Sequence, residues 1–186
     1  MLIDELKNIA RNNGIVGAGG AGFPAYAKMT EKADTVILNC VECEPLLKLH
    51  RQLLATHTEE IIQMLDEVRE SFGAKEAVIG IKSEYVTTIK AIEEVIGDFP
   101  NVRICALKAA YPMGDEVVLI YEATGRVIKP GGLPIDENVV VYNVETMYNL
   151  YRAVHLNIPV TNKLVSIVGE IDHPLTVRVP LGTTVK

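Results

Sequence analysis

The sequence predicts an α/β protein of Rossmann-like architecture, in which a parallel sheet carries helices on both faces. Short apolar runs alternate with longer segments of helical periodicity, which is the pattern of successive βαβ units. The apolar runs lack the alternation of a half-exposed strand, so each strand is expected to be buried on both sides. The composition, 48% hydrophobic and 23% charged over 186 residues, is typical of one globular domain with room for a small appendage.

Helices are predicted from apolar residues at helical spacing. The first occupies the opening dozen residues and is expected to end at Asn12-Asn13-Gly14. A long amphipathic helix is expected from Arg51 to Phe72, where Gly73 terminates it. A further helix is expected after Ser83, which is predicted to cap it. The last two are expected over residues 115–123, ended by Gly125, and over 144–154.

Four short apolar runs predict the strands, at residues 35–38, 77–81, 102–107 and 139–142. Ligands of parallel sheets gather at the carboxyl ends of the strands. The loops that begin at Asn39, Lys82, Leu107 and Asn143 are therefore expected to meet at one edge of the sheet.

The last segment changes character. Residues 163–170 and 175–179 alternate apolar with polar side chains around a turn at 171–174, which predicts an antiparallel hairpin. An isolated hairpin is only marginally stable, so it either docks on the preceding domain or opens a second domain that the chain cuts short. We therefore expect a main domain over residues 1–160 and a hairpin unit over 161–186.

Charge and cysteine content exclude several classes of protein. A net charge of -6 without a basic run argues against a nucleic-acid partner. No apolar run approaches the roughly 20 residues of a membrane span, and acids stand near the N-terminus where a signal peptide carries basic residues, so a cytoplasmic protein is expected. Cys40, Cys43 and Cys105 are too few for a closed four-ligand site, so buried thiols and no metal are expected.

The segment Gly17-Ala18-Gly19-Gly20-Ala21-Gly22-Phe23-Pro24 has four glycines in six residues. Backbone without side chains lets a phosphate or a flat ring contact bare N–H groups, so the segment predicts a ligand cradle. Pro24 is expected to start a helix whose N-terminus points at the ligand. A G-x-G-x-x-G match by itself also fits a tight strand-to-helix turn.

Three further loops are expected beside this cradle and Lys28: residues 39–45, 111–116 and 142–146. In this order, the four motifs resemble the flavin-binding domain shared by the NADH-oxidising flavoprotein subunit of respiratory complex I and the RnfC component of the Rnf electron-transport complex. The segment Glu42-Cys43-Glu44-Pro45 is most similar to the RnfC-like branch. Within it, the chain resembles the cobalamin reductase of propanediol utilisation and the electron-transfer protein associated with proline reductase.

The resemblance implies that the domain binds FMN and accepts electrons from NADH. Hydride passes between the two cofactors, so no side chain is expected to be catalytic. The residues implied to bind FMN are Gly17, Gly19, Gly20, Gly22, Lys28, Asn39, Tyr111, Gly114, Asp115, Asn143 and Thr146. Those implied to face NADH are Phe23, Glu42, Glu44 and Glu116.

The resemblance also bears on what lies outside this chain. Members of the RnfC-like branch continue into a complete β-grasp-like domain, called SLBB, and then into cysteine motifs for [4Fe-4S] clusters. The chain is therefore expected to be an N-terminal fragment whose hairpin begins a truncated SLBB domain. Its partners are expected to be subunits or enzymes of an electron-transfer complex of the cobalamin or proline reductase type, and any association with a membrane or a microcompartment is expected to be through them.

Two other functions stay open from the residues alone. A conventional Rossmann enzyme would use Gly17 to Gly22 for the pyrophosphate of NAD and Glu42 for the ribose. A non-catalytic docking module would use the acidic surface and the hairpin to hold a larger electron-transfer complex together. Taken singly, each motif has an ordinary explanation: Lys28 on a solvated helix face, for example, or Asn143 as a helix cap.

Overall fold

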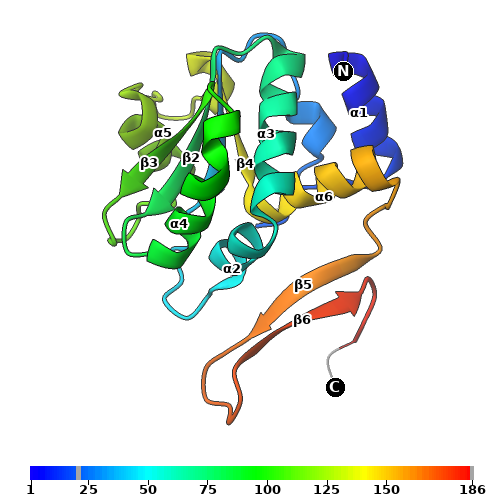
Figure 1. Ribbon diagram of the computed structural model, residues 1–186, viewed down its shortest axis with the longest axis vertical. Helices are drawn as coiled ribbons and strands as arrows, with labels where there is room; N and C mark the ends of the chain where they lie inside the picture. Colours follow the sequence, from blue (N-terminus) through cyan, green and yellow to red (C-terminus); the bar gives the residue numbers. More distant parts are fainter. Residues whose placement is uncertain (20–21, 185–186) are drawn as a thin grey trace.

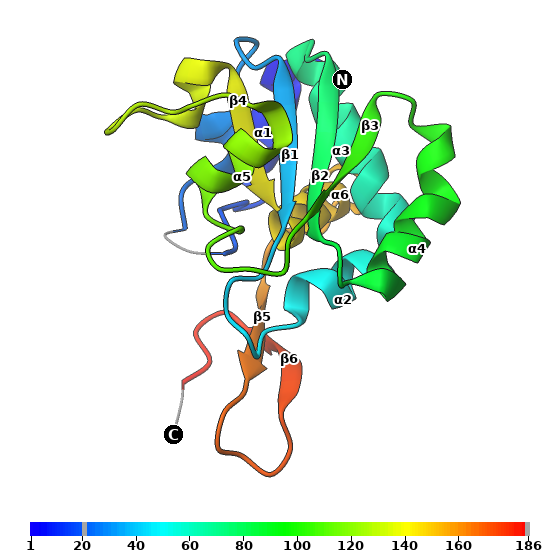
Figure 2. The same ribbon diagram turned by 90° about the vertical axis from the view of Figure 1, so that its left-hand side faces the viewer.

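A parallel sheet forms the centre of the computed structural model, which describes residues 1–19 and 22–184. Its strand order is β3-β2-β1-β4, and Figure 2 shows the strands side by side. The strands are β1 (Thr35–Cys40), β2 (Glu76–Lys82), β3 (Val102–Leu107) and β4 (Val139–Asn143). This confirms the predicted α/β class, and each strand contains the apolar run that predicted it.

Helices cover both faces of the sheet (Figure 1). Side chains alternate between the faces along each strand, so Val36 and Leu38 join a large core with most of the helices, whereas Ile37 joins a smaller core against α5. The helices are α1 (Ile3–Asn12), α2 (Leu49–Thr56), α3 (Thr58–Phe72), α4 (Val86–Val95), α5 (Glu116–Thr124) and α6 (Val144–Leu156). The described residues also form short 3₁₀ helices, η1 (Ala25–Lys28), η2 (Ile96–Asp98) and η3 (Pro134–Glu137).

The expected long helix from Arg51 to Phe72 is wrong, because the chain breaks at His57. The backbone there has φ -125° and ψ 45°, outside the helical region, and the His57 ring stacks on Tyr148 of α6 with 4.3 Å between ring centroids. Threonines on both sides of His57 also have low helix propensity. The break lets α2 and α3 run in different directions (Figure 1).

Two predicted helix starts are also wrong. Ser83 is not the cap of α4, because its backbone N–H donates to the Leu107 carbonyl at 2.8 Å and α4 begins only at Val86. Pro24 precedes the four-residue η1 rather than an α-helix, so it directs no substantial helix dipole at the glycine loop. The predicted ends hold, since Gly73 and Gly125 both adopt the left-handed conformation after α3 and α5.

The hairpin is present as β5 (Asn162–Ile167) and β6 (Leu175–Pro180), paired antiparallel. Figure 1 shows it beneath α2 and the amino-terminal half of α6, on the same side of the molecule as the carboxyl ends of the parallel strands. Its outer residues, such as Ile167 and Leu175, stay exposed. The boundary between residues 160 and 161, and the assignment to an SLBB domain, stay predictions.

The register of the parallel strands determines which loops meet at the carboxyl edge of the sheet. In β1, Asn39 lies opposite Asn143 of β4 and opposite Gly80 of β2, at the carboxyl edge of the sheet. Parallel pairing therefore brings the loops after β1 and β4 together, as the sequence predicted. Within the described parts of the chain, none of the helices is long and apolar enough to cross a membrane.

Candidate functional site

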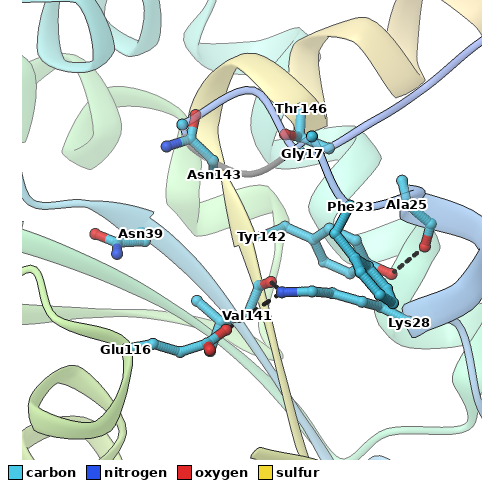
Figure 3. Close-up of a pocket in the computed structure, with 12 residues that line it drawn as sticks. Gly17, Phe23, Ala25, Lys28, Asn39, Glu116, Val141, Tyr142, Asn143 and Thr146 are labelled. Carbon is cyan, nitrogen blue, oxygen red and sulfur yellow. Dashed lines mark hydrogen bonds and ion pairs between the residues drawn. The ribbon is translucent and has the colours of Figure 1, made fainter.

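A pocket of about 320 Å³ opens at the carboxyl edge of the sheet, within the usual size range of ligand sites (Figure 3). The glycine loop, β1, β4 and the first turns of α5 and α6 form its walls. Nine of the fifteen predicted residues line it: Gly17, Gly19, Gly22, Phe23, Lys28, Asn39, Glu116, Asn143 and Thr146. The other lining residues are Ala25, Val141 and Tyr142.

The glycine loop folds back on itself at the mouth of the pocket. The Gly17 N–H donates to the Phe23 carbonyl at 2.7 Å, and the Ala18 N–H donates to the Thr146 hydroxyl at 3.0 Å. A Cβ on Gly19 would lie 2.6 Å from Nδ2 of Asn143, closer than such atoms approach. A side chain at Gly19 would therefore displace the Asn143 amide from its present position. Gly20 lies outside the described residues.

Lys28 extends into the pocket from η1. Its Nζ lies 3.3 Å from Oε1 of Glu116 and donates to the Val141 carbonyl at 3.4 Å, as Figure 3 shows. About a third of the Lys28 side chain is exposed. The pocket therefore holds a partly exposed cation whose charge is shared with one carboxylate.

Asn39 joins the two neighbouring loops. Its Nδ2 donates to the Gly114 carbonyl at 3.0 Å, while its Oδ1 accepts from the Val41 N–H at 2.9 Å. Asp115 caps α5 by accepting from two backbone N–H groups of its first turn. Gly114 and Asp115 therefore lie outside the pocket lining and position Glu116 within it.

The structure does not bring Glu42, Glu44 or Tyr111 into this pocket. Glu42 is only 5% exposed; one oxygen accepts from the His50 N–H at 2.8 Å and the other lies 3.5 Å from Nε of Arg51. Burial raises the pKa of the Glu42 carboxyl, against the opposing effects of these partners. Glu44 is exposed, and Tyr111 is 82% exposed.

Three residues beside the pocket escaped the sequence analysis: His50, Glu145 and Lys163. His50 Nδ1 lies 3.4 Å from Nδ2 of Asn143, and Lys163 contacts both Glu145 and the glycine loop. Glu145 belongs to the motif at 142–146, so the sequence predicted that it lies near the pocket, although it was not named as a site residue. His50 lies on α2 and Lys163 on β5. The local sequence of these elements does not predict that they pack beside the pocket.

The cysteines are free thiols. Cys40 is fully buried, and this burial raises the pKa of its thiol far above the usual range. Cys43 and Cys105 are partly exposed. Over residues 1–19 and 22–184, no three histidine, cysteine or carboxylate side chains are grouped closely enough to hold a metal ion.

Comparisons with known proteins identify the family of this chain. The family described as the Nuo51 FMN-binding domain (Complex1_51K) matches residues 10–152. The chain is 39% identical over 183 residues to the cobalamin reductase PduS of Salmonella typhimurium, covering 98% of this chain and 40% of that protein. It is 33% identical over 184 residues to the C subunit of the Na⁺-translocating ferredoxin:NAD⁺ oxidoreductase complex of Acetobacterium woodii, covering 96% and 42%.

A solved structure of the NAD⁺-reducing [NiFe]-hydrogenase in the H₂-reduced state shares the fold, with a TM-score of 0.79 and 23% identity. The similarity covers 97% of this chain and 37% of that chain. The chain thus spans about 40% of the length of the curated relatives that it matches. Because the family match covers most of the chain, and PduS and the oxidoreductase subunit of Acetobacterium woodii match it over nearly its whole length, the chain belongs to the Nuo51 FMN-binding domain family.

Proposed function

We propose that this chain binds FMN in the pocket at the carboxyl edge of the sheet and passes electrons from a nicotinamide dinucleotide to acceptors outside the chain. The observation that carries the proposal is the convergence of bare glycine backbone, Lys28 and the first turns of α5 and α6 on one cavity. These segments lie far apart in the sequence.

The residues present fit a flat ring with a phosphate. The N-terminus of α6 is suited to an anion. In the glycine loop, the N–H groups of Gly17 and Ala18 already donate to the Phe23 carbonyl and the Thr146 hydroxyl. A side chain at Gly19 would have to displace the Asn143 amide, which lines the same wall. Gly17, Gly19, Asn143 and Thr146 would hold the phosphate end, and Lys28 would lie near the ring.

When bound, FMN supplies the hydride-accepting and electron-passing chemistry. The side chains of this chain then bind and orient it. Lys28 offers a positive charge that favours the anionic, reduced form, while its contact with Glu116 fixes the position of its ammonium group. Phe23 is 50% exposed at the pocket, so its ring is available to a second planar group.

Phe23 and Glu116 are our candidates for contact with the nicotinamide dinucleotide. Two relatives are named for reactions with NAD⁺, which supports this donor. The burial of Glu42 against α2 argues against the conventional Rossmann enzyme, because that enzyme would need this carboxylate at the ribose. Contacts from Glu42, Glu44 and Tyr111 would require movement of their loops.

The names of the relatives also support a role in a larger assembly. The relative from Acetobacterium woodii is one subunit of a ferredoxin:NAD⁺ oxidoreductase complex, and PduS is named a cobalamin reductase. We propose that [4Fe-4S] clusters in longer forms of the protein take the electrons from the flavin. A complete SLBB domain, cobalamin or proline reductase-type partners and a cytoplasmic location belong to the same proposal.

A flavin titration tests the proposal directly. The purified chain is titrated with FMN, the quenching of flavin fluorescence gives the affinity, and NADH is then added without oxygen while the visible spectrum is recorded. We expect tight FMN binding and bleaching of the flavin by NADH. Lys28→Ala should lower FMN affinity at least about tenfold, or 1.4 kcal/mol.

The exposed Lys90 on α4 provides a matched control, because Lys90→Ala removes the same charge far from the pocket. It should leave FMN affinity unchanged. Binding of NAD without FMN would favour a conventional Rossmann enzyme instead, and binding of neither would favour a docking module.

A further inference from the structure

The hairpin contacts the glycine loop and α6, both of which contribute to the pocket lining, through Lys163 of β5. Its Nζ donates to the Ala18 carbonyl in the glycine loop at 2.8 Å and lies 3.4 Å from Oε2 of Glu145 in α6. Lys163 therefore joins three segments that are 18 to 145 residues apart in the sequence. The neighbouring Leu164 N–H donates to the other oxygen of Glu145 at 3.3 Å.

Glu145 presents an electrostatic problem for an anionic ligand. Its side chain is only 4% exposed, and it lies in the first turn of α6 between Asn143 and Thr146, which both line the pocket. A carboxylate there suits the helix dipole but repels a phosphate approaching the same helix end. The ammonium group of Lys163 offsets this charge.

Lys163 also fixes the orientation of the glycine loop. It holds the carbonyl of Ala18, while the N–H of Ala18 donates to the Thr146 hydroxyl. Because both the N–H and the carbonyl of Ala18 are hydrogen-bonded, the positions of the flanking Gly17 and Gly19 in the pocket lining are fixed. The cradle is thus fastened to the hairpin on one side and to α6 on the other.

The charge of Lys163 is also felt on the opposite side of Asn143. Burial, and then the charge of Lys163, lower the pKa of His50 to about 4, so His50 is neutral near pH 7. His50 lies beside Asn143, with its Nδ1 3.4 Å from Nδ2 of the amide.

We propose that Lys163 is a positioning residue of the cofactor site, which holds the glycine loop and neutralises Glu145 so that the phosphate of FMN can bind. The inference rests on the proposed function. It makes the β5–β6 hairpin part of the cofactor site rather than only a link to a following domain.

The test compares FMN with riboflavin, which lacks the phosphate. Affinities are measured by fluorescence titration for the wild type, Lys163→Met, Lys163→Arg and the control Lys90→Met. We expect Lys163→Met to lower FMN affinity at least tenfold and riboflavin affinity by no more than about threefold. Lys163→Arg should stay within about threefold of the wild type for both ligands, because it keeps the charge.

Substitutions of Glu145 separate the electrostatic effect of Lys163 from a purely structural role in holding the hairpin. Glu145→Gln keeps an oxygen for the Leu164 N–H and removes the charge, so it should raise FMN affinity in the wild-type background. Combined with Lys163→Met, it should restore the part of the lost affinity that comes from the unpaired charge of Glu145, while the part that comes from the Ala18 contact stays lost. A fall in FMN and riboflavin affinity by the same factor, without recovery in the double variant, would show that Lys163 only supports the hairpin.

The outcomes distinguish the two proposals. A wild-type chain that binds FMN, beside a Lys163→Met variant that binds it equally well, overturns the inference alone. A wild-type chain that binds neither flavin overturns the proposed function, and the inference with it. Circular dichroism of each variant checks that the fold is intact, and Glu145→Gln provides a test in which Lys163 is untouched.

Discussion

Gly114 gives the sharpest test of how the loops around the pocket fit together. A Cβ at this position would lie 2.2 Å from the carbonyl oxygen of Val41 and 2.8 Å from Sγ of Cys43. The first of these is a backbone atom, so rotation of a side chain cannot relieve the contact. Gly114→Ala must therefore separate the loop after β3 from the loop after β1.

The size of the effect follows from two terms. A contact of 2.2 Å requires a movement of nearly 1 Å to reach the closest distances that real Cβ atoms show, and such overpacking typically costs about 1–3 kcal/mol. The hydrogen bond from Asn39 Nδ2 to the Gly114 carbonyl would also be lost or stretched, at about 1 kcal/mol. We expect Gly114→Ala to lower the free energy of unfolding by about 2–4 kcal/mol.

Urea unfolding followed by circular dichroism measures this change. Gly97→Ala is the matched control, because a Cβ at Gly97 meets nothing within 4 Å and its φ is outside the left-handed region. The control should change stability by less than about 1 kcal/mol. A Gly114→Ala variant within about 0.5 kcal/mol of the wild type would refute the close approach of the two loops.

Three further predictions concern single side chains. Asp115→Ala should lower the free energy of unfolding by about 1 kcal/mol through loss of the α5 cap, whereas Asp115→Asn should lie within a few tenths in the same urea assay. Iodoacetamide should label Cys105 in the folded chain but reach Cys40 only after unfolding, as mass spectrometry of the peptides will show. Burial would raise the pKa of Asp34, but hydrogen bonds from Arg126 and Thr35 hold it below its ordinary value. Stability from this carboxylate is therefore lost as pH falls below about 4, and Asp34→Asn should lower stability at neutral pH and flatten that fall.

The sheet could be predicted from the sequence because buried parallel strands are almost wholly apolar. The runs at 35–38 and 139–142 needed only extension at their carboxyl ends, where the polar Asn39 and Asn143 continue the pairing. The break at His57 could not be predicted, because apolar spacing continues across it and the stack on Tyr148 is a tertiary contact. The spacing of apolar residues does not reveal where a helix changes direction.

The candidate site was predictable in part for the same reason. Strand ends bring loops together whatever their side chains do, so Asn39 and Asn143 meet as expected. The glycine loop and Lys28 precede β1 and follow no strand of the described sheet, so their place at this edge depends on tertiary contacts such as the Ala18 N–H to the Thr146 hydroxyl. The direction of each side chain within a loop depends on contacts from elsewhere. Glu42 turns away from the pocket because the N-terminus of α2 offers it an N–H group and Arg51.

The charges around the pocket are arranged as matched pairs. Lys28 lies against Glu116 in the first turn of α5, and Lys163 lies against Glu145 in the first turn of α6. Each pair is close to neutral, in a chain whose net charge is -6, so a phosphate gains little from long-range attraction. In the proposed site, its recognition would then depend on short-range N–H donors at the N-terminus of α6. Removing either lysine leaves a carboxylate unpaired at a helix end beside the ligand, which costs more than removing both members of the pair. If FMN binds as proposed, the two glutamates would make its binding sensitive to the position of each lysine, and through Lys163 to the position of the hairpin.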